Sequence, residues 1–314
     1  MSGAPGSAAR VFGNYEILTL LGRGGMAEVF RARVLSGPRA GREVALKRIL
    51  PTLAKDPVYV DQFTSEADVS RLLEHPNVVH VLEVGVLDDV YFMVMDLVDG
   101  RDLGQILRKC RHTSLHLPVD FSVFLAKALL DALAYAHEAC GQDGRPLEIV
   151  HCDVSPSNLF ISRTGEIKLG DFGVSRTCIG GGVLAALHAK PYYVSPELLD
   201  GNVTRDADLW SATVTLYELL TLERPFTGHT PDEVFEAVRA RRYVPPSERR
   251  PEIPVALDAI VAKGFAARPE DRFRSAREYG AALAPLFDER VGNPMAIAAV
   301  VRGLFGAGTA PNGS

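Results

Sequence analysis

The spacing of apolar and polar positions changes roughly a third of the way along the chain. Over residues 15–99, short stretches rich in β-branched and aromatic residues alternate with turn residues, which is typical of strands. These stretches read YEILTLLG, EVFRARVL, REVALKRIL, VVHVLEVGVL and YFMVMDLV. Residues 56–75 instead have helical spacing, which places Phe63 and Ala67 on one face together with the acid Glu66.

After Gly100 the pattern becomes mainly helical. Residues 121–139 form a long apolar stretch with helical spacing, and residues 206–221 are apolar nearly all round, which predicts a buried helix. The short strand patterns LFIS and IKLG lie between them. We therefore expect an α+β fold with two lobes: a small β-rich N-lobe with one helix, followed by a larger, mainly helical C-lobe.

The two ends and the change of pattern set the expected domain limits. Both SGAPGSAAR and GAGTAPNGS are runs of small residues, which predicts disorder. We expect a disordered tail over residues 1–11 and the N-lobe over 12–98, with a hinge at 96–98. The C-lobe is then expected over 99–288, and a C-terminal extension with a disordered end over 289–314.

Composition narrows the class of protein. The 314 residues are 47% hydrophobic with a net charge of -5, which is typical of a globular protein and weighs against a nucleic-acid or anionic-membrane surface. The four cysteines form no CxxC pair, so they predict neither a disulfide framework nor a zinc site. No signal peptide precedes the fold, and no apolar run reaches the ~20 residues of a membrane span. We expect a cytoplasmic protein that binds neither nucleic acid nor membrane.

The first candidate functional motif along the chain is a glycine-rich stretch. LGRGGMAEVF has Gly22 and Gly24 in a GxGxxG spacing, but Ala27 stands at the third position. A dinucleotide-binding turn would lead into a helix, whereas EVFRARV alternates like a strand. We therefore expect a strand–turn–strand flap that can lay backbone N–H groups over phosphates, with an ordinary glycine-rich hairpin as the alternative.

Five polar residues lie in otherwise apolar surroundings. Lys47 ends the strand pattern VALK, and a buried Glu66 would need such a partner, although either residue alone reads equally well as solvated. HCDVSPSNLF places Asp153 five residues before Asn158, and GDFGVS adds Asp171. Carboxylate and amide oxygens suit a hard cation such as Mg²⁺, while turn capping is the alternative for each one singly.

The order and spacing of these motifs resemble those of the eukaryotic-type (Hanks-type) protein kinase family. The motifs are the flap, the strand lysine, the helix glutamate, Asp-x4-Asn and DFG. Downstream, YYVSPE with Glu197 resembles the APE segment, DADLWS with Asp208 resembles a buried helix start, and RPEDRF supplies Arg272. The resemblance covers about residues 12–288. The HxDVSPxN form and the insertion CGQDGRPLEI resemble kinases from myxobacteria and related bacteria.

The resemblance implies an ATP site between the lobes. Backbone around the flap glycines would cover the phosphates, and Lys47, held by Glu66, would contact the α- and β-phosphates. Met95 resembles the gatekeeper beside the adenine. The implied nucleotide-binding residues are Leu21, Gly22, Gly24, Val29, Ala45, Lys47, Glu66, Met95, Asp96, Val98 and Phe160.

The resemblance also implies the catalytic roles. Asn158 and Asp171 would bind Mg²⁺, with Mn²⁺ as an alternative, and Asp153 would accept the proton of the substrate hydroxyl. His151 and Asp208 are expected to anchor the catalytic loop, and Glu197 and Arg272 to form a buried ion pair.

Two departures from the family bear on regulation and catalysis. Cys152 replaces the arginine that binds the activation-loop phosphate, and the stretch CIGGGVLAALHAKPYY has no serine or threonine, so activity should not depend on loop phosphorylation. Cys152 and Cys178 are either a redox switch or small packed residues. Ser155 replaces the lysine that serves the γ-phosphate, whereas Lys190 replaces the threonine that neighbours it in the family fold.

We therefore expect Lys190 to bond Asp153 and serve the γ-phosphate, which makes Asp153, Lys47, Lys190 and Ser155 the catalytic set; a solvated Lys190 is the alternative. The expected function is an ATP- and Mg²⁺-dependent serine/threonine protein kinase acting on protein substrates, itself included. The alternative is a pseudokinase that binds nucleotide or a partner without transfer. A small-molecule phosphotransferase is disfavoured, because the helical pattern after Asp208 resembles the protein-kinase C-lobe.

Overall fold

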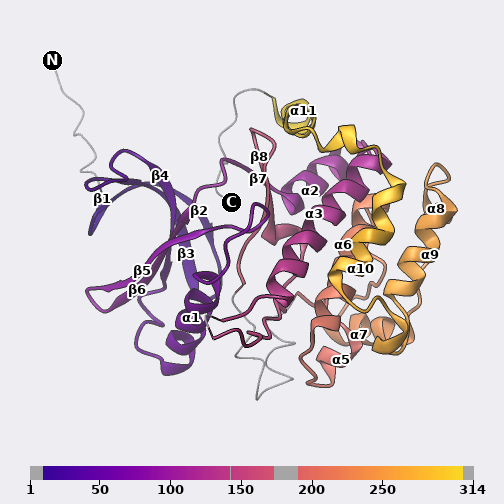
Figure 1. Ribbon diagram of the computed structural model, residues 1–314, viewed down its shortest axis with the longest axis horizontal. Coiled ribbons are helices and arrows are strands. Elements are labelled where there is room, and N and C mark those ends of the chain that lie inside the picture. The colour runs from indigo at the N-terminus through magenta and orange to yellow at the C-terminus, as the bar shows by residue number, and fades with distance from the viewer. Residues whose placement is uncertain (1–9, 142, 173–189, 307–314) are drawn as a thin grey trace.

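Two lobes make up the molecule, a β-sheet lobe and a helical lobe, which confirms the predicted α+β architecture (Figure 1). The structure is a computed structural model that describes residues 10–141, 143–172 and 190–306. In Figure 1 the sheet, in indigo and purple, lies on the left, and the helices of the C-lobe fill the right.

The N-lobe sheet has six antiparallel strands in the order β1-β2-β3-β4-β6-β5. Alternate residues of β3 are buried, as expected for a strand with one face on a core. The strands are β1 Arg10–Phe12, β2 Tyr15–Arg23, β3 Ala27–Val34, β4 Glu43–Ile49, β5 Val81–Leu87 and β6 Val90–Asp96.

Helix α1, Pro57–Ser70, packs against this sheet. Asp56 caps it by accepting the backbone N–H of Val58 at 3.0 Å, and a proline at the first helical position suits a helix start. The predicted helical stretch ran to residue 75, but the helix ends at Ser70, because tighter turn bonds follow, including Leu73 N–H to Ser70 O at 3.3 Å.

The glycine-rich stretch forms the hairpin between β2 and β3, as predicted. Gly22 pairs with Val29 and Arg23 pairs with Glu28, so a strand follows the glycines and not a helix. Ala27 is buried in the same apolar cluster as Ile49, so its methyl group packs inside the lobe, where glycine would leave a gap.

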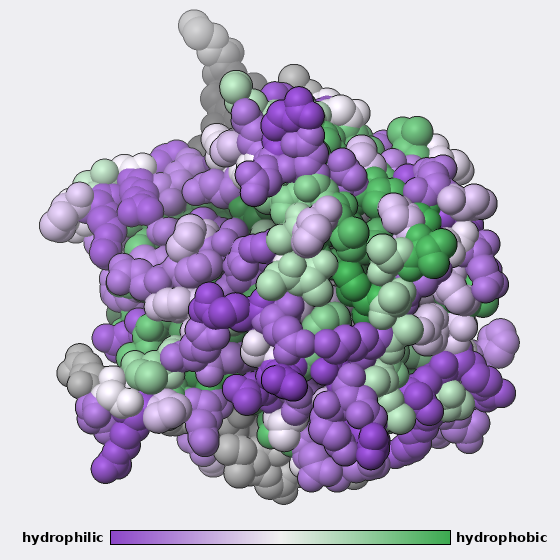
Figure 2. Space-filling model, turned by 45° about the vertical axis from the view of Figure 1, so that its right-hand side comes forward, coloured by the Kyte–Doolittle hydropathy of each residue, from purple (hydrophilic) through white to green (hydrophobic). Residues whose placement is uncertain are grey.

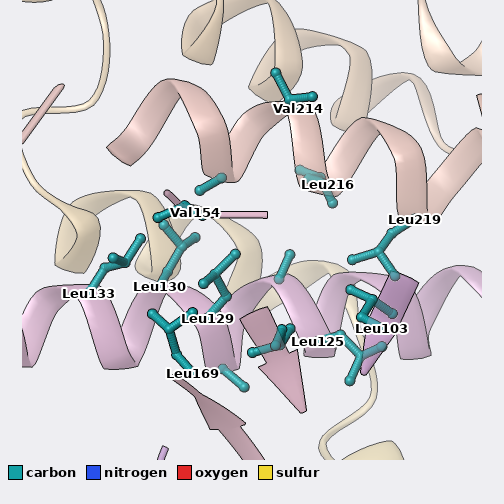
Figure 3. Packing of buried hydrophobic residues seen from close by; sticks show 14 of the residues in the cluster. Leu103, Leu125, Leu129, Leu130, Leu133, Val154, Leu169, Val214, Leu216 and Leu219 are labelled. Atoms are coloured by element: carbon teal, nitrogen blue, oxygen red, sulfur yellow. The ribbon is translucent and has the colours of Figure 1, made fainter. Parts of the chain in front are cut away.

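The C-lobe is built around α3 and α6, whose facing side chains form a continuous apolar core (Figure 3). Helix α6 is buried along nearly its whole length, as its apolar sequence predicts. The helices are α2 Leu103–Thr113, α3 Val119–His137, α5 Pro196–Leu199, α6 Arg205–Thr221, α7 Pro231–Ala240, α8 Pro246–Arg249, α9 Val255–Gly264, α10 Ala276–Leu283 and α11 Pro294–Phe305.

A small second sheet of the C-lobe holds the segments that carry the predicted catalytic residues. Its strands are β7 Gly100–Asp102, β8 Leu159–Ser162 and β9 Ile167–Leu169, in the order β7-β8-β9. A Cβ atom at Gly100 would lie 1.9 Å from the Ile161 carbonyl oxygen, so only glycine lets β7 approach β8 this closely.

The N-terminal end of the described chain differs from the expected tail. Arg10 and Val11, placed in the disordered tail 1–11, pair with Ile17 and Glu16 as part of β1, because Phe12 packs edge-on against Phe92 at 5.4 Å between ring centroids and secures the strand. Residues 1–9 and 307–314, where disorder was predicted, lie outside the described residues.

The apolar run near the C-terminus forms α11, which buries Ile297, Ala298 and Val301 against the C-lobe. Over the described residues, no helix is long and apolar enough to cross a membrane. The face shown in Figure 2 is mostly hydrophilic, with apolar side chains gathered in a band through its middle.

Candidate active site

The loop that carries Asp153 is fixed by one buried carboxylate. Asp208, at the start of α6, accepts the backbone N–H groups of His151 and Cys152, each at 2.8 Å, and a ring nitrogen of His137 lies 2.8 Å away. Cys152 has a φ of 62°, which is uncommon for a residue with a side chain, so these bonds hold a conformation that the free loop would disfavour. His151 and Asp208 thus lie where the anchoring role was predicted.

Asp153 and Asn158 lie side by side. The amide Nδ2 of Asn158 donates to the carboxylate Oδ2 of Asp153 at 2.9 Å and to its backbone oxygen at 2.8 Å. The amide oxygen of Asn158 therefore points away from Asp153. Val154, which lies between Asp153 and Asn158 in the sequence, is buried in the core beside residues of α3 and so anchors the loop (Figure 3).

Lys190 reaches back to this loop. Its ammonium Nζ lies 2.7 Å from Ser155 Oγ, 3.3 Å from Asp153 Oδ2 and 3.5 Å from Asn158 Oδ1. The side chain is 38% exposed, and these three contacts direct its ammonium toward the site. The contact of Lys190 with Ser155 and Asp153 is the one predicted from the sequence.

Lys47 joins the two lobes electrostatically. It is buried, forms an ion pair with Glu66 on α1 and donates to Asp171 Oδ1 at 3.0 Å. Burial alone would lower the pKa of Lys47, but the carboxylates of Asp171 and Glu66 raise it above its ordinary value. Lys47 in turn lowers the pKa of Asp171, although burial opposes this shift. Burial raises the pKa of Glu66, although Lys47 opposes this rise, so the shifts favour the charged forms of Lys47 and Asp171.

An apolar slot opens beside the triad, with a volume of about 210 Å³. Nine of the predicted residues line it: Leu21, Gly22, Val29, Ala45, Met95, Asp96, Val98, Phe160 and Asp171. Leu97, inside the predicted hinge 96–98, lines it as well, and so do Val79 and Gly170, which were not predicted because nothing local in the sequence marks them. Gly24, Lys47 and Glu66 do not line the slot, and the N–H of Gly24 donates to Ala27 O at 2.8 Å within the hairpin turn.

The chemistry of Asn158 and of Asp171, which lines this slot, suits a magnesium ion. The Asn158 amide oxygen and the Asp171 carboxylate are hard ligands, and Asp171 is 38% exposed at the slot. Two protein ligands suit Mg²⁺, which fills its remaining positions with water and phosphate oxygens. Within residues 10–141, 143–172 and 190–306, no cluster of three His, Cys, Asp or Glu residues offers a separate metal site.

The buried ion pair predicted between Glu197 and Arg272 is present. Arg272 donates to both oxygens of Glu197, at 2.6 and 3.0 Å, and its guanidinium stacks over Trp210 at 4.9 Å. Both residues are largely buried, so loss of either partner would leave an unpaired charge in the C-lobe.

A second buried carboxylate was missed. Glu218 on α6 is 2% exposed and accepts hydrogen bonds from the Tyr193 hydroxyl and the Arg111 guanidinium. Burial and this carboxylate raise the pKa of Tyr193, which keeps the hydroxyl protonated as a donor. An acid in the middle of an apolar helix pattern was the available signal.

Cys152 is buried with Val150 and Val203 around it, as expected for the small packed residue. Cys178, the serine- and threonine-free stretch of the activation loop up to Ala189, and the predictions made for them lie outside the described residues.

The comparisons with known proteins agree with this geometry. Residues 15–278 match the family described as "Protein kinase domain". The chain is 34% identical over 303 residues to the tyrosine-protein kinase MasK of Myxococcus xanthus, covering 94% of this chain and 46% of that protein. It is 36% identical over 309 residues to the probable serine/threonine-protein kinase SCO3848 of Streptomyces coelicolor, covering 95% and 44%.

The serine/threonine-protein kinase PrkC of Bacillus subtilis is 32% identical, over 89% of this chain and 41% of that protein. The chain thus spans less than half the length of these curated relatives. The PknI kinase domain of Mycobacterium tuberculosis superposes with a TM-score of 0.66 at 27% identity, covering 89% of this chain and 98% of that one. The predicted resemblance to bacterial Hanks-type kinases is confirmed.

Proposed function

Because the chain belongs to the protein kinase domain family, we propose that it is an ATP- and Mg²⁺-dependent protein kinase that phosphorylates serine or threonine in protein substrates, itself included. One observation carries the proposal: the Lys190 ammonium lies 3.3 Å from the Asp153 carboxylate, as a preorganised positive charge beside the predicted proton acceptor. Asp171, which contacts Lys47 at 3.0 Å, lines the apolar slot.

The slot takes the adenine, and Lys47 takes the α- and β-phosphates. Its ion pairs with Glu66 and Asp171 hold the ammonium in place before the nucleotide arrives, so little reorganisation is required on binding. Asn158 and Asp171 would hold Mg²⁺, which neutralises phosphate charge when bound.

Asp153 orients the substrate hydroxyl and accepts its proton. The Asn158 amide and the Lys190 ammonium fix the direction of its carboxylate, so the hydroxyl is aimed at the γ-phosphate. As negative charge spreads over the γ-phosphate oxygens, Lys190 supplies the nearby positive charge.

The pseudokinase alternative depended on Ser155, on Lys190 and on the unusual activation loop, which lies outside the described residues up to Ala189. With the ammonium of Lys190 2.7 Å from the Ser155 hydroxyl, the reason drawn from these two residues is lost, and nothing else among the described residues favours a scaffold without transfer. The proposal extends to regulation: because Cys152 is a buried, uncharged residue where the family has an arginine, activity is independent of loop phosphorylation. A cytoplasmic location remains a prediction.

The test is phosphotransfer from radiolabelled ATP by the purified protein, with and without EDTA. We expect label in the protein and in a mixed-protein substrate, loss of label with EDTA and restoration by Mg²⁺, and loss of at least ~10³-fold in the Asp153→Asn variant. Phosphoamino-acid analysis is the second readout, since the relatives include both serine/threonine and tyrosine kinases by name. Equal labelling by Asp153→Asn, or label on tyrosine alone, would contradict the proposal.

A further inference from the structure

Two cavities beside the active site share a wall. The first, of about 390 Å³, is lined by Ser155 and Lys190, and so opens at the site of phosphotransfer. The second, of about 770 Å³, lies under the loop that follows α6. Arg111 and Arg224 line both cavities, so the two are adjacent hollows of one surface that begins at Ser155 and Lys190. We call this surface the basic groove.

The lining of the basic groove is strongly cationic. Among the residues that the structure describes, only two carboxylates line it, those of Glu218 and Glu223. The cationic lining residues are Lys190, Arg108, Arg111, Arg224, Arg242 and Arg249. Because the whole chain carries a net charge of -5, this positive surface is a local concentration against an acidic background.

One of the two carboxylates is unavailable to a substrate. Glu218 is 2% exposed and is already bonded to Arg111 and Tyr193, and the Arg224 guanidinium lies 4.0 Å from it. The two arginines themselves remain 35% and 37% exposed. The groove therefore presents guanidinium groups to a ligand and hides the acid that holds them.

The guanidinium groups are held in fixed positions. Arg224 lies over the ring of Tyr192 at 3.8 Å, and Arg111 Nε donates to the Leu222 carbonyl oxygen at 2.6 Å. Arg108 and Arg242 are exposed and have no ion-pair partner among the described residues. Fixed, partly unpaired guanidinium groups are well matched to carboxylates, which they bind through two parallel hydrogen bonds.

We propose that the basic groove binds an acidic segment of the protein substrate, so that the kinase selects a phosphoacceptor with Asp or Glu side chains on one side of it. This inference rests on the proposed function, because the groove starts at Lys190, whose ammonium lies 3.3 Å from Asp153. An extended peptide whose acceptor hydroxyl reaches Asp153 has to continue along an exit from the site, and the basic groove is such an exit. A peptide is thus the occupant that the position favours over a free anion.

The experiment compares serine peptides of one length in which a single Glu, Gln or Lys is placed at each position before and after the acceptor. We expect kcat/KM to be about tenfold higher for Glu than for Gln at positions on one side only, and lower again for Lys. The preference should shrink as NaCl is added, because part of each contact is solvent-exposed.

The double variant Arg108→Gln, Arg242→Gln removes two exposed charges that hold no other residue in place, so the fold should persist. We expect it to lower the Glu-to-Gln ratio of kcat/KM about tenfold, through KM. The matched control is Arg241→Gln, an exposed neighbour that does not line the groove, which should keep the ratio of the unaltered protein.

A Glu-to-Gln ratio near one at every position, or one that the double variant leaves intact, would overturn the inference. So would a preference for a phosphoserine in place of Glu that the Glu peptides do not share. If no peptide at all is phosphorylated and Asp153→Asn labels like the unaltered protein, the proposed function fails first, so the two failures are distinguishable.

Discussion

Ser155 and Lys190 are the residues at which this chain departs most from its family in chemistry. The family carries a lysine on the catalytic loop and a threonine on the facing segment, and here a hydroxyl and an ammonium occupy those positions in reverse. The two side chains touch at 2.7 Å, so the positive charge remains beside Asp153 although another segment supplies it. Electrostatic stabilisation depends on where a charge lies and not on which segment carries it.

The first prediction is that Lys190→Ala lowers kcat by ~10²–10³, since a preorganised donor of this kind stabilises the transition state by ~3–4 kcal/mol. Steady-state phosphotransfer to a peptide measures it. Lys168→Ala is the control, because that lysine donates to the Pro76 carbonyl oxygen, away from the site, and the variant should stay near the activity of the unaltered protein. Full activity in Lys190→Ala would show that the ammonium has no catalytic role.

The exchanged double variant Ser155→Lys, Lys190→Thr extends this prediction. We expect it to recover much of the activity lost in Lys190→Ala, because it returns the ammonium to the loop and a hydroxyl to the facing segment. Such recovery is non-additive and is expected only for coupled neighbours. A double variant as inactive as the product of its single changes would contradict the coupling.

At the residue scale, the sequence predicts those side chains whose chemistry is unusual for their surroundings. Lys47 and Glu66 could be paired in advance because a buried acid requires a cation. Val79 could not be placed in the slot, because an ordinary apolar residue carries no mark of which cavity it lines. Glu218 was missed because its partners, Arg111 and Tyr193, are far from it in sequence.

Among the elements, α11 lies outside the part of the chain that resembles the family, yet it packs closely on the C-lobe. Gly165, in the turn after β8, has a φ of +92°, and a Cβ atom there would lie 2.1 Å from the Pro294 carbonyl oxygen. The start of α11 therefore fits against a backbone that has no side chain at this point.

The second prediction concerns this contact. Gly165→Ala should lower Tm by several degrees more than Gly144→Ala, which is the control because Gly144 also has a positive φ, +77°, but has open space around it. Strain at such a φ costs ~1–3 kcal/mol in both variants, whereas only Gly165→Ala displaces Pro294. Each extra kcal/mol lowers Tm by about 2–4 °C in a large domain. Equal shifts in a thermal melt would show that the packing of α11 contributes nothing.

The elements themselves were largely predictable, because each depends on local periodicity. The hairpin followed from the alternation in EVFRARV, and α6 from its apolar sequence. The ends of elements were not predictable: α1 stops at Ser70 although its apolar spacing continues, and β1 forms through a contact of Phe12 with a distant ring. Tertiary contacts decide such limits.

On the scale of the whole molecule, Lys47 is one of the residues that join the two lobes. Lys47 belongs to the N-lobe sheet, and Asp171 follows β9 of the C-lobe, so their contact at 3.0 Å closes the site between the two bodies of the fold. Lys47 and Asp171 are in contact although Cys152 stands at the position where the family has its phosphate-binding arginine.

The third prediction follows from this. Phosphatase treatment of the purified protein should leave its activity on an added substrate unchanged, because a phosphate acts only where a cation can pair with it. The assay compares treated and untreated protein, with removal of phosphate checked by intact mass. A large loss of activity that preincubation with ATP restores would show that loop phosphorylation is required.

The exchange of hydroxyl and ammonium between Ser155 and Lys190 also bears on inhibitor selectivity. Compounds that fill the adenine slot meet ordinary apolar residues there, which offer little to distinguish one kinase from another. The 390 Å³ cavity beside Ser155 instead presents the ammonium of Lys190 from a segment where the family has an uncharged threonine. A small acidic compound seated there would pair with an ammonium that reaches it from the facing segment, whereas in kinases of the usual pattern the lysine of the catalytic loop supplies the charge, so a compound shaped for one direction of approach would fit the other less well.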